Sequence, residues 1–229
     1  MTARRVLVIG GTGKIGRPLV ELLRARGAQA VVLARNPGFG GLAIDTADTA
    51  ALEAAAQGFD AAFLTTPLGP DEGEIGVAAV AALRRAGVGR IVYIAIHNLE
   101  AMQAIPHFAT KIPVKAAVLD GEGGTVLQPN FFFQNDLLAL PAIRQGGIYP
   151  MPIGHAGIWS IDAADIALAA ANALLDDAGM GEAVNLCGPE MLTGTDYAAH
   201  WAEALGRPVV YPGDAVEPFL GAMQQAIPG

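Results

Sequence analysis

Cysteine, aromatic residues and charged residues are all scarce in this chain of 229 residues, at one cysteine, 6% and 16% respectively. The single cysteine, Cys187, excludes an intramolecular disulfide, and we expect it to be a small buried apolar residue rather than a reactive thiol. The four histidines are not closely spaced and have no carboxylate cluster beside them. The sequence therefore predicts no metal site.

Excess positive charge and long apolar runs are also missing. The net charge is -8 and no basic cluster occurs, which argues against a surface that binds nucleic acid. No stretch of about 18 uncharged apolar residues is available to span a bilayer. Arg4 and Arg5 lead into an apolar strand of about five residues, which is too short for the core of a signal peptide. We therefore expect a soluble cytoplasmic protein.

What the chain has is apolar residues, at 52%, and 29 glycines, enough for a sheet covered by helices on both faces. Short apolar runs alternate with segments of helical periodicity. The expected strands are 6–9, 30–34, 41–44, 61–65, 90–96, 125–128, 184–187 and 209–211. The first expected helix follows the glycine loop at 10–16 and ends at Gly27. The other expected helices cover 50–57, 72–85, 107–119, about 162–175 and 196–205.

This alternation of strand and helix predicts an α/β fold with a doubly wound parallel sheet, because parallel strands need right-handed crossovers. Within it, Asp48 or Thr49 is expected to cap the helix that follows. Pro113 must lie near the start of its helix or kink it. We expect a core over residues 1–145 and a small C-terminal region over 146–229, near the open ends of the strands.

The first strand ends in the glycine-rich stretch Gly10-Gly11-Thr12-Gly13-Lys14-Ile15-Gly16. Gly10 is expected to leave the strand in a conformation that other residues avoid, and Gly13 to let the backbone approach a pyrophosphate. Gly16 is expected to allow close packing of helix on strand. Free N–H groups and the positive end of the helix dipole then face the phosphates. The order of strand, turn and helix predicts a dinucleotide site that includes Thr12 and Ile15.

Arg35 follows the second strand, where an acid would bind the ribose hydroxyls of NAD. Its planar guanidinium suits a 2′-phosphate, and Lys14 adds a second positive charge. The residues thus favour NADP over NAD, although a solvated loop arginine is the alternative. Asp45, after the third strand, is either an acceptor for the adenine amino group or an ordinary turn residue.

Several segments in a fixed order resemble the NmrA-like family of atypical short-chain dehydrogenases/reductases. Beside the glycine loop they are residues 33–37 (LARNP), 63–67 (FLTTP), 107–111 (HFATK), 128–135 (QPNFFFQN), 160–167 (SIDAADIA) and 188–190 (GPE). The resemblance covers nearly the whole chain. It implies a Rossmann domain with a small substrate-side subdomain and NADP more often than NAD. Members of the family usually continue well beyond the equivalent of Phe219, so we expect this chain to be short.

The resemblance also implies roles for individual residues. Thr65, Thr66 and Pro67 would flank the nicotinamide ribose, Lys111 would anchor it, and the backbone at Asn130 and Phe131 would line the nicotinamide pocket. The classical Tyr-x-x-x-Lys pair is here His107 and Lys111, the two candidate catalytic residues.

A tyrosine-dependent carbonyl mechanism is not supported, because the tyrosine is replaced and the usual serine is missing from Ala95-Ile96-His97. His107 is either a proton donor or an ordinary loop residue. Hydride delivery to a quinone-like acceptor needs less from the protein. We therefore expect an NAD(P)H-dependent reductase of a small conjugated acceptor. The alternative is a non-catalytic NADP(H) sensor that acts through a protein partner. A homodimer is compatible with either.

Overall fold

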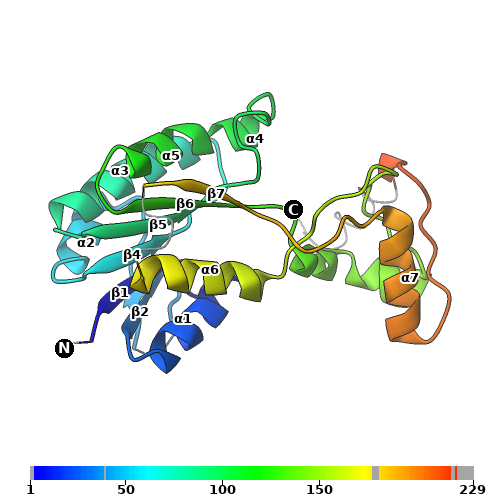
Figure 1. The fold of residues 1–229 in the computed structure, drawn as a ribbon, viewed down its shortest axis with the longest axis horizontal. Coiled ribbons are helices and arrows are strands. Elements are labelled where there is room, and N and C mark those ends of the chain that lie inside the picture. The colour runs from blue at the N-terminus through cyan, green and yellow to red at the C-terminus, as the bar shows by residue number, and fades with distance from the viewer. Residues whose placement is uncertain (1–2, 39, 177–180, 218–219, 221–229) are drawn as a thin grey trace. The chain divides into compact units, whose positions relative to one another are not determined.

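The computed structural model describes residues 3–38, 40–176, 181–217 and 220. Phe219, named above for the expected chain length, lies outside them. In the described residues, parallel strands form one sheet in the order β3-β2-β1-β4-β5-β6-β7 (Figure 1). The strands are β1 (Arg5–Ile9), β2 (Gln29–Ala34), β3 (Leu42–Ala43), β4 (Ala61–Leu64), β5 (Arg90–Ile94), β6 (Gly124–Pro129) and β7 (Ala183–Leu186). The predicted doubly wound parallel sheet is confirmed.

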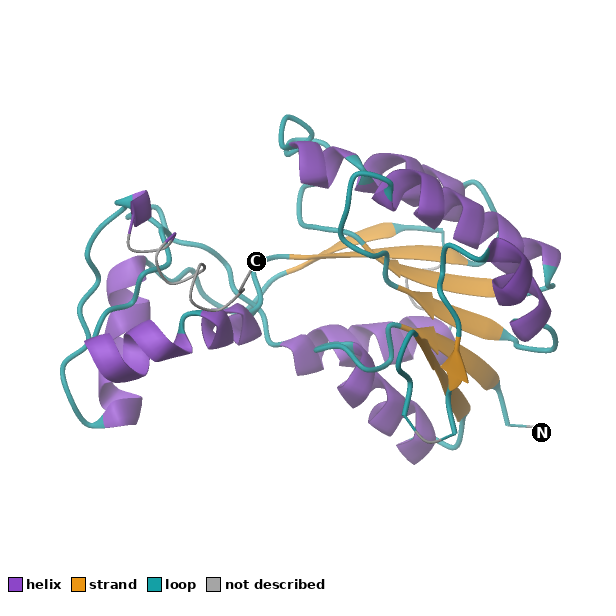
Figure 2. Cartoon of the chain, turned by 180° about the vertical axis from the view of Figure 1, so that it is seen from behind, coloured by secondary structure: helices purple, strands orange, loops and turns teal. Residues whose placement is uncertain are grey.

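Helices cover both faces of this sheet, with α1 and α6 on one and α2, α3 and α5 on the other (Figure 2). The helices are α1 (Gly16–Ala25), α2 (Thr49–Ala55), α3 (Glu72–Arg85), α4 (Pro106–Ala109), α5 (Lys111–Leu119), α6 (Ala163–Leu175) and α7 (Gly194–Leu205), with a 3₁₀ helix η1 (Phe133–Leu138) and a π-helical turn η2 (Ala142–Gly146). Because both faces are covered, the central strands are largely apolar, and every residue of β4 and β5 is buried, including Arg90 at the start of β5.

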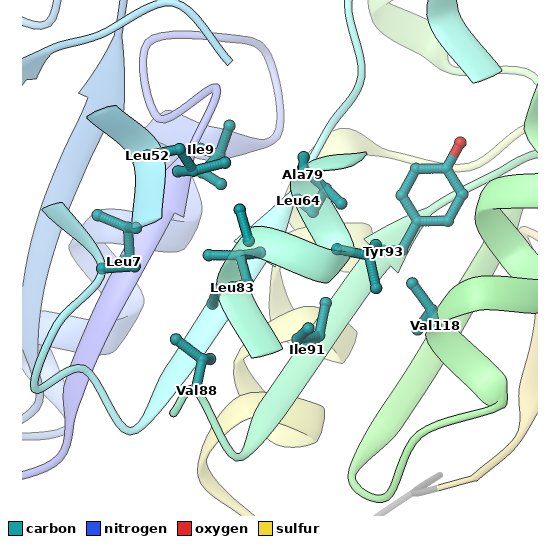
Figure 3. Close-up of a cluster of buried hydrophobic side chains, with 14 of the residues drawn as sticks. Leu7, Ile9, Leu52, Leu64, Ala79, Leu83, Val88, Ile91, Tyr93 and Val118 are labelled. Carbon is teal, nitrogen blue, oxygen red and sulfur yellow. The ribbon is translucent and has the colours of Figure 1, made fainter. Parts of the chain in front are cut away.

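One large apolar cluster lies between the sheet and the helices α2, α3 and α5. Figure 3 shows Leu7 and Ile9 of β1 and Ile91 of β5 turned toward Leu83 of α3. Tyr93 is fully buried, and its hydroxyl group points away from the other labelled side chains (Figure 3). The core thus fixes α3 directly over the strands whose ends carry the candidate site.

The start of α2 shows how a single polar residue sets a helix boundary. Asp48 is the N-cap, and its Oδ1 accepts a hydrogen bond from the backbone N–H of Ala51 at 3.0 Å. We expect Asp48→Ala to lower the free energy of unfolding by about 1 kcal/mol, because an N–H of the first turn loses its partner. Urea unfolding measures this. Thr49→Ala is the control, and an equal loss there would contradict the assignment.

The predicted helix over 107–119 is wrong in one detail. Thr110 separates α4 from α5. Pro113 has no N–H to offer the carbonyl of Ala109, so the helical hydrogen-bond ladder is interrupted at this point. His107 and Lys111 therefore lie on two successive helices.

Two further expectations are corrected at the C-terminal end. Residues 209–211 form no strand, and Val210 makes only an isolated bridge with Ile148. Cys187 is exposed rather than buried. It follows the edge strand β7 and continues the exposed alternation of Ala183 and Asn185.

The chain divides into two compact units that differ from the predicted ranges 1–145 and 146–229. The first unit comprises Met1–Pro129 and Ala163–Leu186, and the second comprises Asn130–Asp162 and Cys187–Gly229. The reason is that the chain leaves the sheet at the end of β6, then packs against the sheet as α6 and joins its edge as β7.

The second unit has its own small core. Tyr149 stacks on Tyr197 with ring centroids 5.1 Å apart. Asp136 accepts hydrogen bonds from the Tyr149 hydroxyl at 2.9 Å and from Trp201 Nε1 at 2.8 Å. Burial raises the pKa of this carboxyl despite the two donors. The helix α7 begins at Gly194, two residues before its predicted start, because Thr193 and Asp196 form a capping box.

Across the described ranges, no helix is long and apolar enough to cross a membrane.

Candidate functional site

A cavity of about 280 Å³ opens at the carboxyl ends of the central strands. The strand order reverses between β1 and β4, since the chain runs outward from β1 to β3 and then returns to the other side. Doubly wound sheets bind ligands at such a switch point. The cavity is lined by Ile9, Gly10, Thr12, Leu33, Ala34, Arg35, Asn36, Ile44, Asp45, Thr46, Thr65, Thr66 and Pro67.

The glycine loop makes the turn from β1 possible. Gly10 has φ +80°, and a Cβ atom there would lie 2.1 Å from Thr65 Oγ1. At Gly16, a Cβ would lie 2.3 Å from the carbonyl oxygen of Gly10. Both positions thus exclude a side chain, the first by conformation and contact and the second by contact alone. Gly10 leaves the strand with a positive φ, and Gly16 allows a close approach at the start of α1, as predicted.

The remaining residues of the glycine loop lead directly into α1. Ile15 is the N-cap and makes no side-chain hydrogen bond, so the helix has no polar cap of its own. Gly13 donates its N–H to the Gly10 carbonyl at 2.9 Å, which closes the turn. Lys14 is on the same loop, and partial shielding from water lowers the pKa of its ammonium group. This combination suits an anionic group at the helix N-terminus.

Arg35 and Asp45 lie at the end of the cavity formed by β2 and β3. Arg35 is exposed and lines the cavity. Asp45 Oδ1 accepts a hydrogen bond from the N–H of Ala47 at 3.0 Å, so one carboxylate oxygen shapes the turn. The structure therefore brings together the two residues assigned to the adenosine side of a dinucleotide.

Thr65, Thr66 and Pro67 form the opposite wall, directly after β4. Thr65 donates its hydroxyl to the carbonyl of Ile9 at 3.2 Å, which ties the end of β4 to that of β1. Thr66 donates its hydroxyl to Glu72 Oε1 at 2.5 Å. The wall is thus linked to the first residue of α3.

Glu72 is a residue that the sequence did not single out. Its position suggests only a favourable charge at a helix N-terminus, yet its side chain is completely buried. Lys111 Nζ donates to Glu72 Oε1 at 2.5 Å and Thr110 Oγ1 donates to Oε2 at 2.8 Å. Gly73, the next residue, is a signal for such a close approach, because a Cβ there would lie 2.9 Å from the carbonyl oxygen of Thr110.

The electrostatics of this cluster are set by Glu72. Burial raises the pKa of the Glu72 carboxyl, but the hydrogen bonds from Lys111, Thr66 and Thr110 outweigh it and leave the pKa below its usual range. The three donors around it, with the Lys111 ammonium as counter-ion, favour the carboxylate form. Burial also raises the pKa of Tyr93, whose hydroxyl lies 3.4 Å from Thr66 Oγ1.

The two candidate catalytic residues both contact Glu72. Lys111 is buried and does not belong to the described lining of the cavity. His107 is exposed, and its Nδ1 lies 3.4 Å from Glu72 Oε2. Ala95 and His97 belong to the segment from which the usual serine is missing. Ala95 is buried, and His97 donates its backbone N–H to the carbonyl of Pro129 at 3.0 Å. The direct roles assigned to Lys111 and His107 remain predictions.

Asn130 and Phe131 belong to the second unit. Asn130 Oδ1 accepts a hydrogen bond from the N–H of Phe131 at 2.7 Å, and the carbonyl of Phe131 accepts one from the N–H of Ile161 at 2.9 Å. The second bond, with the isolated bridge between Phe132 and Ile161, ties the segment that follows β6 to the segment before α6. Their predicted contact with a cofactor stays a prediction.

The parallel sheet, the glycine turn at its switch point and the basic residue after β2 define a Rossmann-type α/β protein with a site of dinucleotide type. The sequence profile of the NmrA-like family matches residues 2–217. The chain belongs to the NmrA-like family, as the ordered motifs predict.

Relatives with assigned activities match most of the chain. An NAD(P)H azoreductase from Xenophilus azovorans is 33% identical over 95% of this chain and 80% of its own length. A (4-alkanoyl-5-oxo-2,5-dihydrofuran-3-yl)methyl phosphate reductase from Streptomyces griseus is 32% identical over 97% of this chain and 82% of its own. The crystal structure of an NADPH-dependent quinone oxidoreductase from Escherichia coli, complexed with NADPH, superposes with a TM-score of 0.81, at 25% identity over 96% of this chain and 82% of that one.

Proposed function

We propose that this protein binds NADP(H) in the cavity at the switch point and reduces a small conjugated acceptor of the quinone type. The observation that carries the proposal is the position of Arg35, an exposed guanidinium on the cavity wall where a protein selective for NAD has an acid. The glycine turn, which excludes side chains at Gly10 and Gly16, leaves the backbone open to a pyrophosphate. The relatives named above are reductases, and their names agree with this site.

Within this proposal the residues of the cavity bind and orient. Arg35 holds the 2′-phosphate at one end of the cavity, and Thr65, Thr66 and Pro67 hold the ribose at the other. Lys14, on the glycine loop beside the cavity lining, adds a second positive charge. When bound, NADPH supplies a hydride. Placing a flat acceptor against a held cofactor supplies much of the rate enhancement, because the two reactants no longer have to meet in the correct orientation. The absence of the classical tyrosine is compatible with this chemistry.

The second candidate is a redox sensor that binds NADP(H) and acts through a protein partner. The arrangement of Lys111 favours it, since the ammonium group contacts the buried Glu72 and does not line the cavity. In this case a homodimer or a regulatory partner would read the state of the cofactor. The two candidates share the cofactor site and differ in turnover.

Steady-state consumption of NADPH, followed by its absorbance, separates the two candidates. With a panel of quinones and azo dyes we expect turnover of about 1 s⁻¹ or more with at least one acceptor. NADH should be the weaker donor, because it has no phosphate for Arg35. If every acceptor is inert while NADPH binds tightly, the reductase proposal is wrong and the sensor remains. If NADPH does not bind, both proposals fail.

A further inference from the structure

A charged carboxylate without solvent exposure needs an explanation, because burying an ion costs several kcal/mol unless its partners compensate. Glu72 is 0% exposed and accepts hydrogen bonds from Lys111, Thr66 and Thr110. A buried ion pair stabilises a fold little better than apolar side chains of the same size. Stability alone therefore gives no reason for this chain to have a charge at position 72.

The local packing is built to admit this carboxylate. Glycines at positions 73 and 76 allow α3 to approach its neighbours. A Cβ at Gly76 would lie 2.5 Å from Val114 Cγ2 and 2.8 Å from Thr66 Cγ2. The missing side chains thus bring α5 and the cavity wall to the same end of α3.

Of the three donors to Glu72, only Thr66 also lines the cavity. A hydroxyl group has one proton, and that of Thr66 is directed to Glu72 Oε1. The Tyr93 hydroxyl lies 3.4 Å from the same Thr66 oxygen, and Tyr93 is fully buried. The proton of Thr66 is consequently not available to a ligand, so its hydroxyl oxygen can serve a ligand only as an acceptor.

We propose that Glu72 is a positioning residue of the cofactor site: it takes the Thr66 proton, so that Thr66 Oγ1 presents a fixed hydrogen-bond acceptor to a hydroxyl or amide N–H group of the ligand. Lys111 is the counter-ion that keeps the buried carboxylate charged. This assignment rests on the proposed function, since it takes the ligand to be NADP(H). It gives Lys111 an indirect role through Glu72 and Thr66.

The first test compares two threonines that donate to the same carboxylate. Thr66→Val removes the acceptor from the cavity wall and should weaken NADPH binding about 10-fold, because a donor of the ligand loses its partner. Thr110→Val removes a hydroxyl that lies 2.8 Å from Glu72 Oε2 and 2.7 Å from the carbonyl oxygen of His107, and it removes no residue of the cavity wall. Its NADPH affinity should therefore stay within about 2-fold of the wild type. Equal affinities of the two variants would overturn the assignment.

The second test removes the ion pair without changing the net charge. Glu72→Gln combined with Lys111→Met keeps the approximate shape and removes both charges. We expect NADPH to bind about 10-fold more weakly, and Thr66→Val to cost less than about 2-fold in this background, because the orientation of the hydroxyl is no longer fixed. Glu53→Gln with Arg85→Met removes a surface pair of 2.7 Å and is the matched control, expected to bind as the wild type.

Isothermal titration gives the affinities, and thermal unfolding shows whether each variant is folded. A purely structural pair would lower the thermal midpoint and leave the cost of Thr66→Val unchanged, which would contradict the proposal. If the Glu72 and Lys111 variant does not fold, the comparison of Thr66→Val with Thr110→Val decides alone. Failure of the wild type to bind NADPH refutes the proposed function, whereas wild-type binding with additive variants refutes only the role of Glu72.

Discussion

Gly10→Ala is expected to abolish NADPH binding at micromolar concentrations and to lower the free energy of unfolding by about 3 kcal/mol. Two separate penalties contribute. Gly10 has φ +80°, a conformation that costs an L-residue about 1 kcal/mol. The added Cβ would also lie 2.1 Å from Thr65 Oγ1, so one of the two chain segments must move. Movement of either segment displaces the cavity wall.

Two further variants separate these penalties. Gly27 has φ +82°, and a Cβ added there would have nothing within 4 Å, so Gly27→Ala should cost only the conformational term of about 1 kcal/mol. Adding Thr65→Ala to Gly10→Ala removes the clashing oxygen, and the next atom, Thr65 Cβ, is 3.4 Å away. This double variant should regain about 1–2 kcal/mol relative to Gly10→Ala.

Urea unfolding gives the free energies, and fluorescence of bound NADPH gives the affinities. If Gly10→Ala and Gly27→Ala were equally stable, the contact with Thr65 would have no role. If Gly10→Ala bound NADPH normally, the loop would not be part of the cofactor site.

The sequence was sufficient for the fold and for the half of the site that depends on local patterns. β1, its glycine turn and α1 are neighbours in the chain, so their order and spacing predict their geometry. The positions of Arg35 and Asp45 are likewise predictable, because each residue directly follows a predicted strand. Gly10, Thr12, Arg35 and Asp45 line the observed cavity, whereas Gly13, Lys14, Ile15 and Gly16 are not among its described lining residues.

Glu72 shows where such reasoning ends. An acid in the first turn of a helix has a sufficient local explanation in the helix dipole, so nothing in the sequence marks it as buried. Its burial depends on α5, which follows it by about 40 residues, and on the small volume of Gly73 and Gly76. Contacts of this kind come from tertiary packing. A glycine pair beside an acid is nevertheless a pattern that can be sought.

The two compact units differ from the predicted ranges for a related reason. The segment from Asn130 to Asp162 contains the short helices η1 and η2, which have no strong periodicity. The return of the chain to the sheet as α6 and β7 depends on pairing between β6 and β7, with Leu127 opposite Val184. Strand pairing between distant segments is not encoded locally. Residues 209–211 have the composition of a strand but form only one bridge.

Arg35→Glu is expected to weaken NADPH binding by about 100-fold, or about 3 kcal/mol, because it removes a charge-assisted contact to the 2′-phosphate and adds repulsion. NADH has no phosphate at this position, and a carboxylate can accept hydrogen bonds from its ribose hydroxyls. Its affinity should therefore stay the same or rise, and the preference between the two cofactors should fall or reverse. The effect on NADPH should shrink as salt is added, because Arg35 is exposed.

Arg26→Glu is the matched control, since it changes the net charge by the same amount at the far end of α1. Arg26 Nη1 donates to Asn172 Oδ1 at 2.7 Å and is not in the described cavity lining. Its NADPH affinity should stay within about 2-fold of the wild type, so a larger loss in this variant would indicate long-range electrostatics in place of direct contact. Unchanged NADPH binding in Arg35→Glu would remove the 2′-phosphate assignment. The glycine loop would then mark a dinucleotide site without a preference for the phosphorylated cofactor, because none of its backbone contacts distinguishes NADP from NAD.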